Sequence, residues 1–427
     1  MMKACSFGAG RSSLAALVVA CGLVGGVAVA ASPEPGPAAA REQSSEQTRE
    51  QARRMATKAI AYLRSKQDVS GGWSVNPKGP TFPAITGLVV SGMLGSGVLE
   101  STSDASVNRG VEFILSKRQP DGGIYDQVLP AYNTAICLST LAKADTPAAR
   151  EAIKPAQDFL RSLQWSETAL AESKAPDAPK PVGREHAYYG GVGYGRHGRP
   201  DLSNLSFVLQ GLHDSGVKAD DEAFKRALVF LQRTQMLATT TGKDGEKVVV
   251  NDMPYAKGST QGGFIYATSV NKDQVGVGQT YGGEIEETLD DGRKVSRLRA
   301  YGSMTYAGFK SYLYAGLEKN DPRVLAALHW IGSNYTLEEN PNCGTDGLYY
   351  YFVTFARALG SFGEPMIAVT GPDKATTQRD WRADLVQRLA KLQNEDGSFK
   401  SVDDRWMEND PVLITAYALI ALGEAGR

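Results

Sequence analysis

The sequence predicts an all-α protein built from about six repeated pairs of helices, and three observations support this fold class. Apolar residues recur at helical spacing in the first helix of each pair, as at Ala59, Ile60 and Leu63. The second helix of each pair is apolar nearly all round, as in residues 414–420, which indicates burial on more than one side. Glycine-containing turns separate the helices along most of the chain. Such an array is either a double-layered barrel or a curved solenoid, and these observations leave both open.

Each copy of the repeat has the same order. The first helix ends near a glutamine, a glycine-containing turn follows, and the second helix begins. The glutamines that end the first helices are Gln67, Gln119, Gln164, Gln235 and Gln393, and the fifth copy has Gly344 and Gly347 at its turn. The second helices begin near Thr86, Thr134, Ser203, Thr305, Tyr349 and Thr415.

Two insertions interrupt the repeats. Residues 166–201 are rich in glycine and tyrosine, and residues 236–299 contain alternating segments and an Asp-Asp-Gly turn at 290–292. The second insertion therefore predicts a small β-hairpin. Insertions of this length are often lids or binding loops, but surface decoration explains them equally well.

The N-terminal region predicts export. Lys3 and Arg11 are followed by an apolar stretch at 14–29 with a small-residue cleavage site, so residues 1–30 are typical of a signal peptide. Lipidation of Cys21 is an alternative, and either a lipidated or an uncleaved N-terminus would bring the protein into contact with a membrane. Residues 31–55 predict a flexible linker, and residues 56–427 predict one helical domain. The expected location is periplasmic or secreted.

Composition and motif searches exclude several classes of function. The formal net charge of -1 leaves no long basic face for nucleic acid. Cys137 lies in an apolar helical stretch and Cys343 in a polar loop, so free thiols are expected rather than a disulfide. The sequence has no zinc-ligand cluster, phosphate loop or dinucleotide fingerprint, so no cofactor and no metal are expected.

The spacing Gln67-x-x-x-Gly71-x-Trp73, with its counterpart Gln393-x-x-x-Gly397-x-Phe399, resembles the QW motif of squalene-hopene and oxidosqualene cyclases. The β subunits of protein prenyltransferases share it in weaker form. The resemblance extends over residues 56–426 and includes exported bacterial proteins described only as prenyltransferase and squalene oxidase repeat proteins. It implies an α/α toroid, a closed ring with the second helices inside, more strongly than it implies any activity.

The chemistry of these families requires residues that this chain lacks. The cyclases protonate their substrate with an Asp-x-Asp-Asp-Thr-Ala stretch, whereas residues 129–135 keep Thr134 and Ala135 but place Asn133 where a carboxylate is needed. The prenyltransferases use a zinc-binding histidine just before the threonine of the last inner helix, where this chain has Ile414. Neither protonation at this position nor zinc-dependent prenylation is therefore expected.

Polar and aromatic residues instead stand just before the second helices, and a closed ring would bring them to one end of a central cavity. The candidate catalytic residues, as general acids or bases, are Asp410, Glu408 and Asp201. The candidate ligand-binding residues are Tyr132, Asn133, Asn204, Tyr301, Tyr349, Tyr350 and Asn409. Helix capping explains Asp201 and Asp410 equally well. A solvated loop carboxylate is the alternative for Glu408, and ordinary packing is the alternative for the tyrosines.

Three hypotheses for function follow. The favoured one is a non-catalytic or degenerate toroid that binds an apolar or polymeric ligand, such as an isoprenoid, a lipid or a glycan. The second is a terpenoid cyclase-like isomerase or lyase that uses the carboxylates at the cavity rim. The third is an α/α barrel that acts on polysaccharide with a carboxylate pair. Burial of Glu408 and Asp410 in a tyrosine-walled cavity would favour an enzyme, and solvent-facing caps would favour a binding protein.

Overall fold

The computed structural model describes residues 37–75, 79–99, 103–169, 180–195, 199–242, 244–288 and 291–427. The chain divides into two compact units, Met1–Gln43 and Ser44–Arg427, and the second unit contains the helical repeats. The predicted signal peptide, residues 1–30, lies outside the described residues.

Helix α1 (Pro37–Ser65) includes most of the segment that the sequence predicts as a flexible linker. Residues 37–55 are helical, because this stretch is rich in strong helix formers such as alanine, glutamate, glutamine and arginine. Ala52 and Met55 are also buried in the main hydrophobic core, which anchors the second half of the helix. The helical layer therefore begins well before residue 56.

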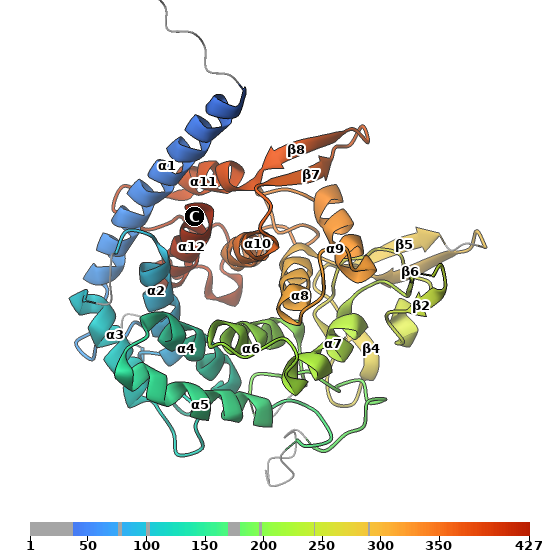
Figure 1. Cartoon of the computed structure of the whole chain (residues 1–427), viewed down its shortest axis with the longest axis horizontal. Helices are drawn as coiled ribbons and strands as arrows, with labels where there is room; N and C mark the ends of the chain where they lie inside the picture. Colours follow the sequence, from blue (N-terminus) through green and yellow to red (C-terminus); the bar gives the residue numbers. More distant parts are fainter. Residues whose placement is uncertain are drawn as a thin grey trace, which may run out of the picture. The chain divides into compact units, whose positions relative to one another are not determined.

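The second unit is an α/α toroid, a closed ring of paired helices (Figure 1). The inner ring consists of α2 (Pro83–Gly95), α4 (Pro130–Ala144), α6 (Leu202–Asp214), α8 (Gly302–Tyr314), α10 (Leu348–Phe362) and α12 (Pro411–Ala425). The outer ring consists of α1, α3 (Ala105–Ser116), α5 (Pro147–Ser162), α7 (Glu222–Thr234), α9 (Pro322–Ser333) and α11 (Trp381–Leu392). Each inner helix packs on the next, and α12 packs on α2, which confirms the closed ring.

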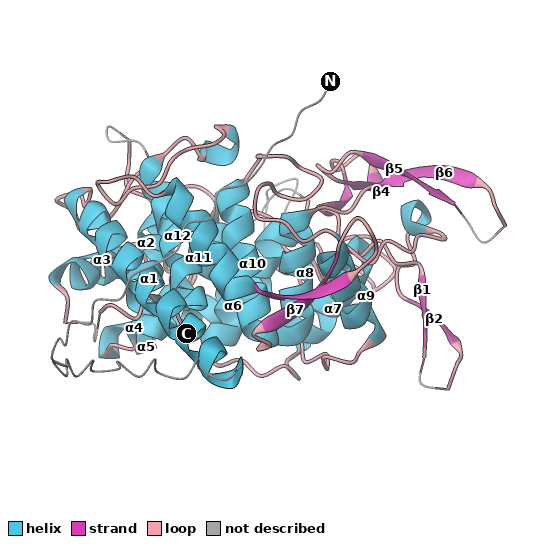
Figure 2. Cartoon of the chain, turned by 90° about the horizontal axis from the view of Figure 1, so that it is seen from above, coloured by secondary structure: helices cyan, strands magenta, loops and turns pink. Residues whose placement is uncertain are grey.

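Four two-stranded antiparallel hairpins project from the helices in the described part of the chain (Figure 2). They are β1–β2 (Thr239–Thr241 and Lys247–Val249), β3–β4 (Ala267–Ser269 and Val275–Gln279), β5–β6 (Glu284–Thr288 and Lys294–Leu298) and β7–β8 (Met366–Thr370 and Thr376–Asp380). The first three lie in the insertion where the sequence predicts a hairpin, and β5 pairs with β6 from Glu284↔Leu298 to Thr288↔Lys294. The sequence analysis did not predict β7–β8. Two short 3-10 helices, η1 (Pro254–Ala256) and η2 (Arg405–Met407), complete the structure.

The repeated glutamines connect successive outer helices. The Gln67 amide donates to the carbonyl of Gly71 in its own turn and to the carbonyl of Ser106 in the next outer helix, both at 2.8 Å. The same pair of bonds is made by Gln164 to Gly190 and Ala223, by Gln235 to Gly262 and Arg323, and by Gln393 to Gly397 and Met55. Because Met55 belongs to α1, the last of these bonds closes the outer ring. Gln119 departs from the pattern and bonds within its own turn.

The turn glycines and inner-helix threonines have equally definite roles. Gly190 has a φ of +83°, and a Cβ there would lie 1.9 Å from the carbonyl oxygen of Arg226. The residue after such a turn donates its N–H to a threonine hydroxyl of the inner helix, as Trp73 does to Thr86 at 3.0 Å. These contacts give a physical reason for the repeated order of glutamine, glycine and threonine.

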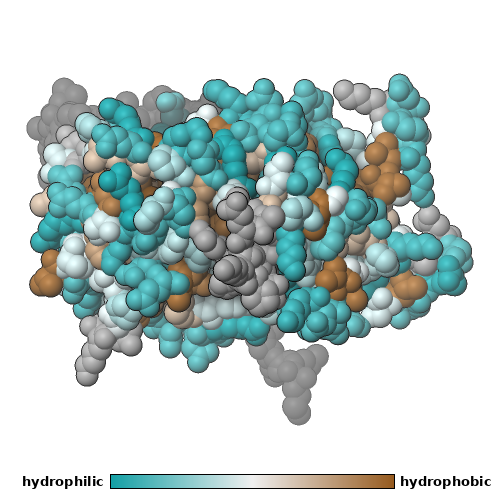
Figure 3. Space-filling model, turned by 90° about the horizontal axis from the view of Figure 1, so that it is seen from below, coloured by the Kyte–Doolittle hydropathy of each residue, from teal (hydrophilic) through white to brown (hydrophobic). Residues whose placement is uncertain are grey.

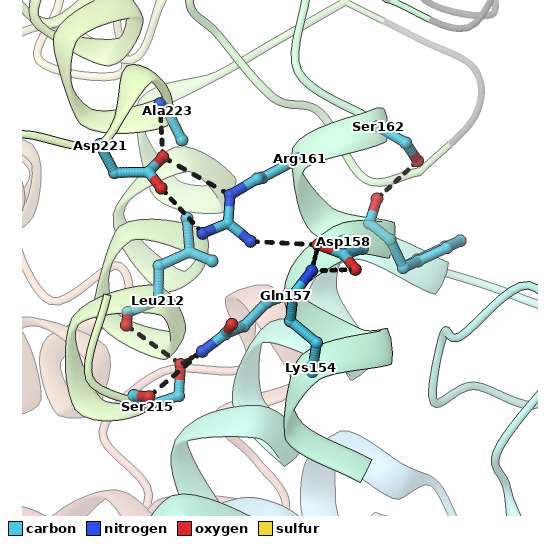
Figure 4. Close-up of polar contacts among 10 residues, drawn as sticks. Lys154, Gln157, Asp158, Arg161, Ser162, Leu212, Ser215, Asp221 and Ala223 are labelled. Atoms are coloured by element: carbon cyan, nitrogen blue, oxygen red, sulfur yellow. Dashed lines mark hydrogen bonds and ion pairs between the residues drawn. The ribbon is translucent and has the colours of Figure 1, made fainter. Parts of the chain in front are cut away.

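Polar contacts connect neighbouring repeats on the outside of the barrel (Figure 4). Arg161 of α5 pairs with Asp221 (Nη2 to Oδ2, 2.9 Å), the residue that caps the N-terminus of α7. The Gln157 amide of the same helix donates to the hydroxyl of Ser215, just after α6, at 2.9 Å. Helix α5 is thereby bound to both helices of the following pair.

The outer wall of the barrel is mainly hydrophilic on the side drawn in Figure 3, with hydrophobic residues scattered over it. Among the described residues no helix is long and apolar enough to cross a bilayer. Cys137 is buried, Cys343 is half-buried, and both are free thiols.

Candidate functional site

An aromatic pocket of about 450 Å³ lies where the inner helices begin. Its wall contains seven tyrosines, two phenylalanines and one tryptophan: Tyr132, Tyr194, Tyr266, Tyr281, Tyr301, Tyr350, Tyr417, Phe82, Phe207 and Trp406. Several rings meet edge to face, including Tyr132 with Phe207 at 5.2 Å between centroids. These residues come from most of the repeats, so only the closed ring assembles them.

The tyrosine hydroxyls are the main polar groups of this wall. Burial raises the pKa of Tyr132 to about 12, and burial likewise holds the pKa of Tyr350 above its ordinary value. The Tyr350 hydroxyl lies 2.9 Å from the Ser203 hydroxyl, across the ring from α10 to α6. At neutral pH these phenols are therefore protonated and can donate hydrogen bonds into the pocket.

Backbone strain is concentrated at the rim of the pocket. Among the described residues, seven that are not glycine have a positive φ, and four of these are Gln127, Leu129, Trp406 and Met407. Three of the four also line the pocket, and Trp406 and Met407 remain 40% and 54% exposed. Bulky side chains rarely adopt this conformation, which costs about 1 kcal/mol or more per residue. The surrounding structure therefore holds these apolar side chains at the opening, although their backbone conformation is unfavourable.

Trp406 is fixed from three sides. Its ring meets Tyr281 edge to face at 5.4 Å, and the Arg405 guanidinium lies 4.7 Å from its centroid. Arg405 is itself paired with Asp346 at 2.9 Å. The third neighbour is Gly347, where a Cβ would lie 2.7 Å from the indole ring. Segment 405–407 consequently forms an ordered strap at the mouth of the pocket.

Glu408 follows this strap and lines the pocket, with only 1% of its surface exposed. Its carboxylate accepts hydrogen bonds from the N–H groups of Tyr349 (3.0 Å) and Tyr350 (2.8 Å). It thus caps the N-terminus of α10 from a different repeat. Burial raises the pKa of Glu408 to about 7, although these two bonds act in the opposite direction. Among the described lining residues it is the one carboxylate.

Asp201 and Asp410 are conventional helix caps. Asp201 Oδ1 accepts from the N–H of Asn204 at 2.9 Å at the start of α6, and Asp410 Oδ1 accepts from the N–H of Val412 at 2.9 Å at the start of α12. Burial raises the pKa of Asp201 to about 6, and the pKa of half-buried Asp410 is raised for the same reason. Neither residue is part of the pocket lining. Asp201 lies directly behind it, because the Tyr266 hydroxyl that bonds to Asp201 belongs to a lining residue.

The remaining predicted ligand-binding residues separate into two groups. Tyr132, Asn133, Tyr301 and Tyr350 line the pocket, and Asn133 also caps α2 by accepting from the N–H of Ala84 at 2.8 Å. Asn204, Tyr349 and Asn409 are not lining residues: Asn204 is buried beside Asp201, Tyr349 donates to the carbonyl of Lys400 at 2.6 Å, and Asn409 is exposed.

Sequence reasoning named three of the ten aromatic residues of this wall and missed the other seven. Tyr194 and Tyr281 lie in the two insertions, each beside glycines, so the glycine- and tyrosine-rich composition was the available signal. Tyr266 comes just before β3 in the second insertion and Trp406 lies in η2, and both take positions that are set only by the folded chain. Tyr417 belongs to an inner helix, where its aromatic character did not distinguish it from a core residue.

Among the described residues, no group of three or more histidine, cysteine, aspartate or glutamate side chains is placed to hold a metal ion.

Comparisons with known proteins support the fold. No family model matches the chain, and no curated protein matches its sequence. The α-1,6-mannanase GH76A of Salegentibacter is similar in structure, with a TM-score of 0.50 at 9% identity, over 88% of this chain and 98% of that one. The type II terpene cyclase MstE from Scytonema gives a TM-score of 0.46 at 15% identity, over 89% and 98% of the two chains. An α-amylase from Clostridium perfringens gives 0.48 at 11% identity, over 87% and 97%. At 9% identity the likeness to the mannanase concerns the fold and not the activity.

Proposed function

We propose that this protein binds an apolar, isoprenoid-type ligand in the aromatic pocket and that binding, rather than catalysis, is its main role. One observation carries the proposal: the pocket wall is mainly aromatic and aliphatic, while the three candidate catalytic carboxylates are all used to cap inner helices. A carboxylate that accepts backbone N–H bonds at a helix start already has a structural role.

The size and chemistry of the pocket agree with such a ligand. A volume of about 450 Å³ lies within the usual range for small-molecule sites, which are mostly apolar with a few polar groups that orient the ligand. Tyr132 and Tyr350 can supply those polar contacts to a hydroxyl or carbonyl head. Aromatic faces provide contact area for a branched, unsaturated chain at little cost in conformational entropy.

A polysaccharide-cleaving role has less support. Glycoside hydrolysis generally uses two carboxyl groups on either side of the scissile bond. Among the described residues that line this pocket, Glu408 is the one carboxyl group, and its two oxygens accept backbone hydrogen bonds.

Export from the cytoplasm is part of the same proposal and rests on the sequence of residues 1–30. An exported protein would meet a lipid or isoprenoid at the outer side of a membrane. The exposed apolar side chains of Trp406, Met407 and Leu129 at the opening suit the transfer of such a ligand into the pocket.

The test is ligand identification followed by a matched pair of variants. Native mass spectrometry with lipid extraction on the purified mature protein is expected to detect an isoprenoid or related lipid. Titration with geranylgeraniol is then expected to show binding that Tyr281→Ala weakens about tenfold. The control Tyr125→Ala removes a half-buried tyrosine outside the pocket and should leave affinity unchanged. An empty protein that binds mannotriose better than geranylgeraniol would contradict the proposal.

A second candidate function has one specific observation in its favour. Glu408 is a buried carboxyl group in the aromatic pocket with a pKa raised to about 7, which suits a general acid in an isomerase or cyclase-like reaction. Glu408→Gln separates the two roles. If the protein only binds, the variant retains its ligand and no conversion of added geranylgeraniol or squalene is seen in either protein. If Glu408 donates a proton, wild type forms a product and the variant does not.

A further inference from the structure

A second chamber, of about 340 Å³, lies at the opposite end of the barrel, where the inner helices end. The side chains that line it are polar and charged for the most part: Lys143, Gln210, His213, Asp214, Tyr314, Arg357, Ser361, Glu424 and Arg427, with Leu313 and Gly360. A gap of about 10 Å³ shares Gln210 and Arg357 with this chamber and Phe207 with the aromatic pocket, so it lies between the two. The two chambers are therefore distinct sites on one axis.

Two cations of this lining, Arg357 and Lys143, are joined by Lys310, which lies behind the lining and bonds to the lining residue Gln210. Arg357 of α10 is 6% exposed, Lys310 of α8 is 2% exposed, and Lys143 of α4 is half-buried. Lys310 Nζ donates to Gln210 Oε1 at 2.6 Å, and Lys143 Nζ donates to Ser91 Oγ at 3.0 Å. Both acceptors are neutral, so within the described chain neither ammonium group has an ion-pair partner.

Arg357 is the least satisfied of the three. Its buried Nε has no hydrogen-bond partner among the described residues, and no carboxylate pairs with its guanidinium there. The side chain lines both the chamber and the narrow gap behind it. Burial of a guanidinium without a hydrogen-bond acceptor costs free energy of folding, so packing alone does not explain an arginine at this position.

The acidic residues of the chamber attract these cations through charge, but within the described chain they form no ion pair with Arg357, Lys143 or Lys310. Asp214 is occupied by Ser139, by the Gln210 amide at 3.2 Å and by His213 at 3.4 Å. Glu424 pairs with Arg427 at 2.7 Å. The C-terminal ends of the inner helices favour cations in general, but among the described residues Arg357 donates no hydrogen bond to a helix carbonyl.

We propose that this chamber binds a phosphate group, held by Arg357 in a bidentate contact and by Lys143 and Lys310 through charge. The planar fork of arginine matches two phosphate oxygens, and the lysines act as point charges beside it. With Arg427 included, the four cations exceed the two acids by two, and a phosphate dianion would balance that excess while accepting from the Arg357 guanidinium, which no carboxylate pairs with in the described chain. This inference does not depend on the ligand of the aromatic pocket.

Isothermal titration of the full-length mature protein with inorganic phosphate, and separately with glycerol phosphate, tests the proposal. Wild type is expected to bind, and Arg357→Met is expected to weaken binding at least about tenfold. The matched control is Arg382→Met, because Arg382 also has a buried Nε without a partner but lies on outer helix α11, over Trp381. Binding of both probes would indicate recognition of phosphate whether free or esterified, and binding of inorganic phosphate alone would indicate the free ion.

Two results would overturn the proposal. One is the absence of binding by wild type for both probes at about 10 mM, which corresponds to an interaction too weak for a built site. The other is equal binding by wild type and Arg357→Met. If Arg357→Met does not fold, Arg357→Lys keeps a charge but loses the bidentate fork, and unchanged phosphate binding by that variant would also count against the proposal.

Discussion

The two ends of the barrel are made by the same six inner helices, yet one end is aromatic and the other is charged. At the N-terminal ends, Asp201, Asp410, Glu408 and Asn133 accept backbone N–H bonds beneath a wall of rings. At the C-terminal ends, Lys143, Lys310 and Arg357 gather around a polar chamber. Because the inner helices run in the same direction, the positive ends of their dipoles meet at one mouth and the negative ends at the other.

This difference changes how the charged residues should be interpreted. Acids at helix starts and cations at helix ends are what the dipoles favour, so their presence alone does not indicate catalysis. The informative groups are those whose hydrogen-bonding capacity or raised pKa is not explained by helix capping. At the aromatic end these are the phenols and the raised pKa of Glu408, and at the charged end it is Arg357 with its unpartnered Nε.

The largest effect is expected from Phe207→Ala, because Phe207 belongs to both the aromatic pocket and the gap behind it. Removing this buried ring should lower the free energy of unfolding by about 3 kcal/mol in urea denaturation. It should also join the two chambers, so that a longer prenyl alcohol binds relatively better than a shorter one. Phe207→Leu is the control and should cost about 1 kcal/mol. An unchanged preference for prenyl chain length in the alanine variant would show that the ring does not separate the chambers.

The second prediction uses the opposite pH responses of the two ends. The folded-state pKa values of Glu408 and Asp201 are raised to about 7 and about 6, so the stability they contribute is present at low pH and lost as pH rises toward 7. Those of Lys310 and Lys143 are lowered to about 7 and about 8, so the folded state is least favoured near neutral pH and gains stability as pH rises to 9.

The free energy of unfolding should therefore pass through a minimum near pH 7, with a change on the order of 2 kcal/mol on each side. Denaturation at fixed ionic strength between pH 5 and 9 measures the profile. His186 has the opposite effect below pH 7, because burial lowers its pKa, but it is one group against the three carboxyl groups of Glu408, Asp201 and Asp410. A stability maximum at neutral pH would contradict the assignment of buried, uncompensated groups to both ends.

A third prediction isolates the charged end. Lys310→Met removes a buried ammonium from an apolar helix and should raise the free energy of unfolding at pH 7 by about 1 to 2 kcal/mol, even though Gln210 loses its partner. The increase with pH above 7 should become shallower in the same variant. Lys143→Met, at a less buried position, should show the same direction with a smaller amplitude. If phosphate occupies the chamber during the measurement, the gain should shrink, because the charge is then compensated.

Much of the fold could be predicted from the sequence because it depends on local contacts that recur. Gln67, Gly71 and Thr86 bond within one repeat or to the next, so their spacing carries the information directly. The position of the pocket was also predictable, since it follows from the starts of the inner helices. The roles of Asp201 and Asp410 as caps are equally local.

The residues that could not be predicted meet only when the ring closes. Lys143 and Arg357 lie far apart in the sequence and come from α4 and α10. Nothing local to either residue indicates that the other lies across the same chamber. Glu408 caps a helix from another repeat, and in hairpin β7–β8 the apolar strand β7 pairs with a strand, β8, that is wholly polar and mostly exposed. The signal peptide stays a prediction.

The smallest effect on stability, and the sharpest separation of stability from binding, is expected at Trp406. Its φ of 54° is strained for a bulky residue, so Trp406→Gly relieves about 1 kcal/mol of strain while losing the contacts with Tyr281 and Arg405. These terms should nearly cancel, and the unfolding midpoint in urea should hardly move. Affinity for an apolar ligand should nevertheless fall about tenfold, because the ring covers the pocket mouth. The control is Met407→Gly, because the φ of Met407 is also positive, at 64°, and its side chain is more exposed. This variant should lose less affinity. If Trp406→Gly binds the ligand as tightly as wild type does, ligand binding does not explain the strained backbone of segment 405–407. Stability would not explain that strain either, because the unfolding midpoint is unchanged.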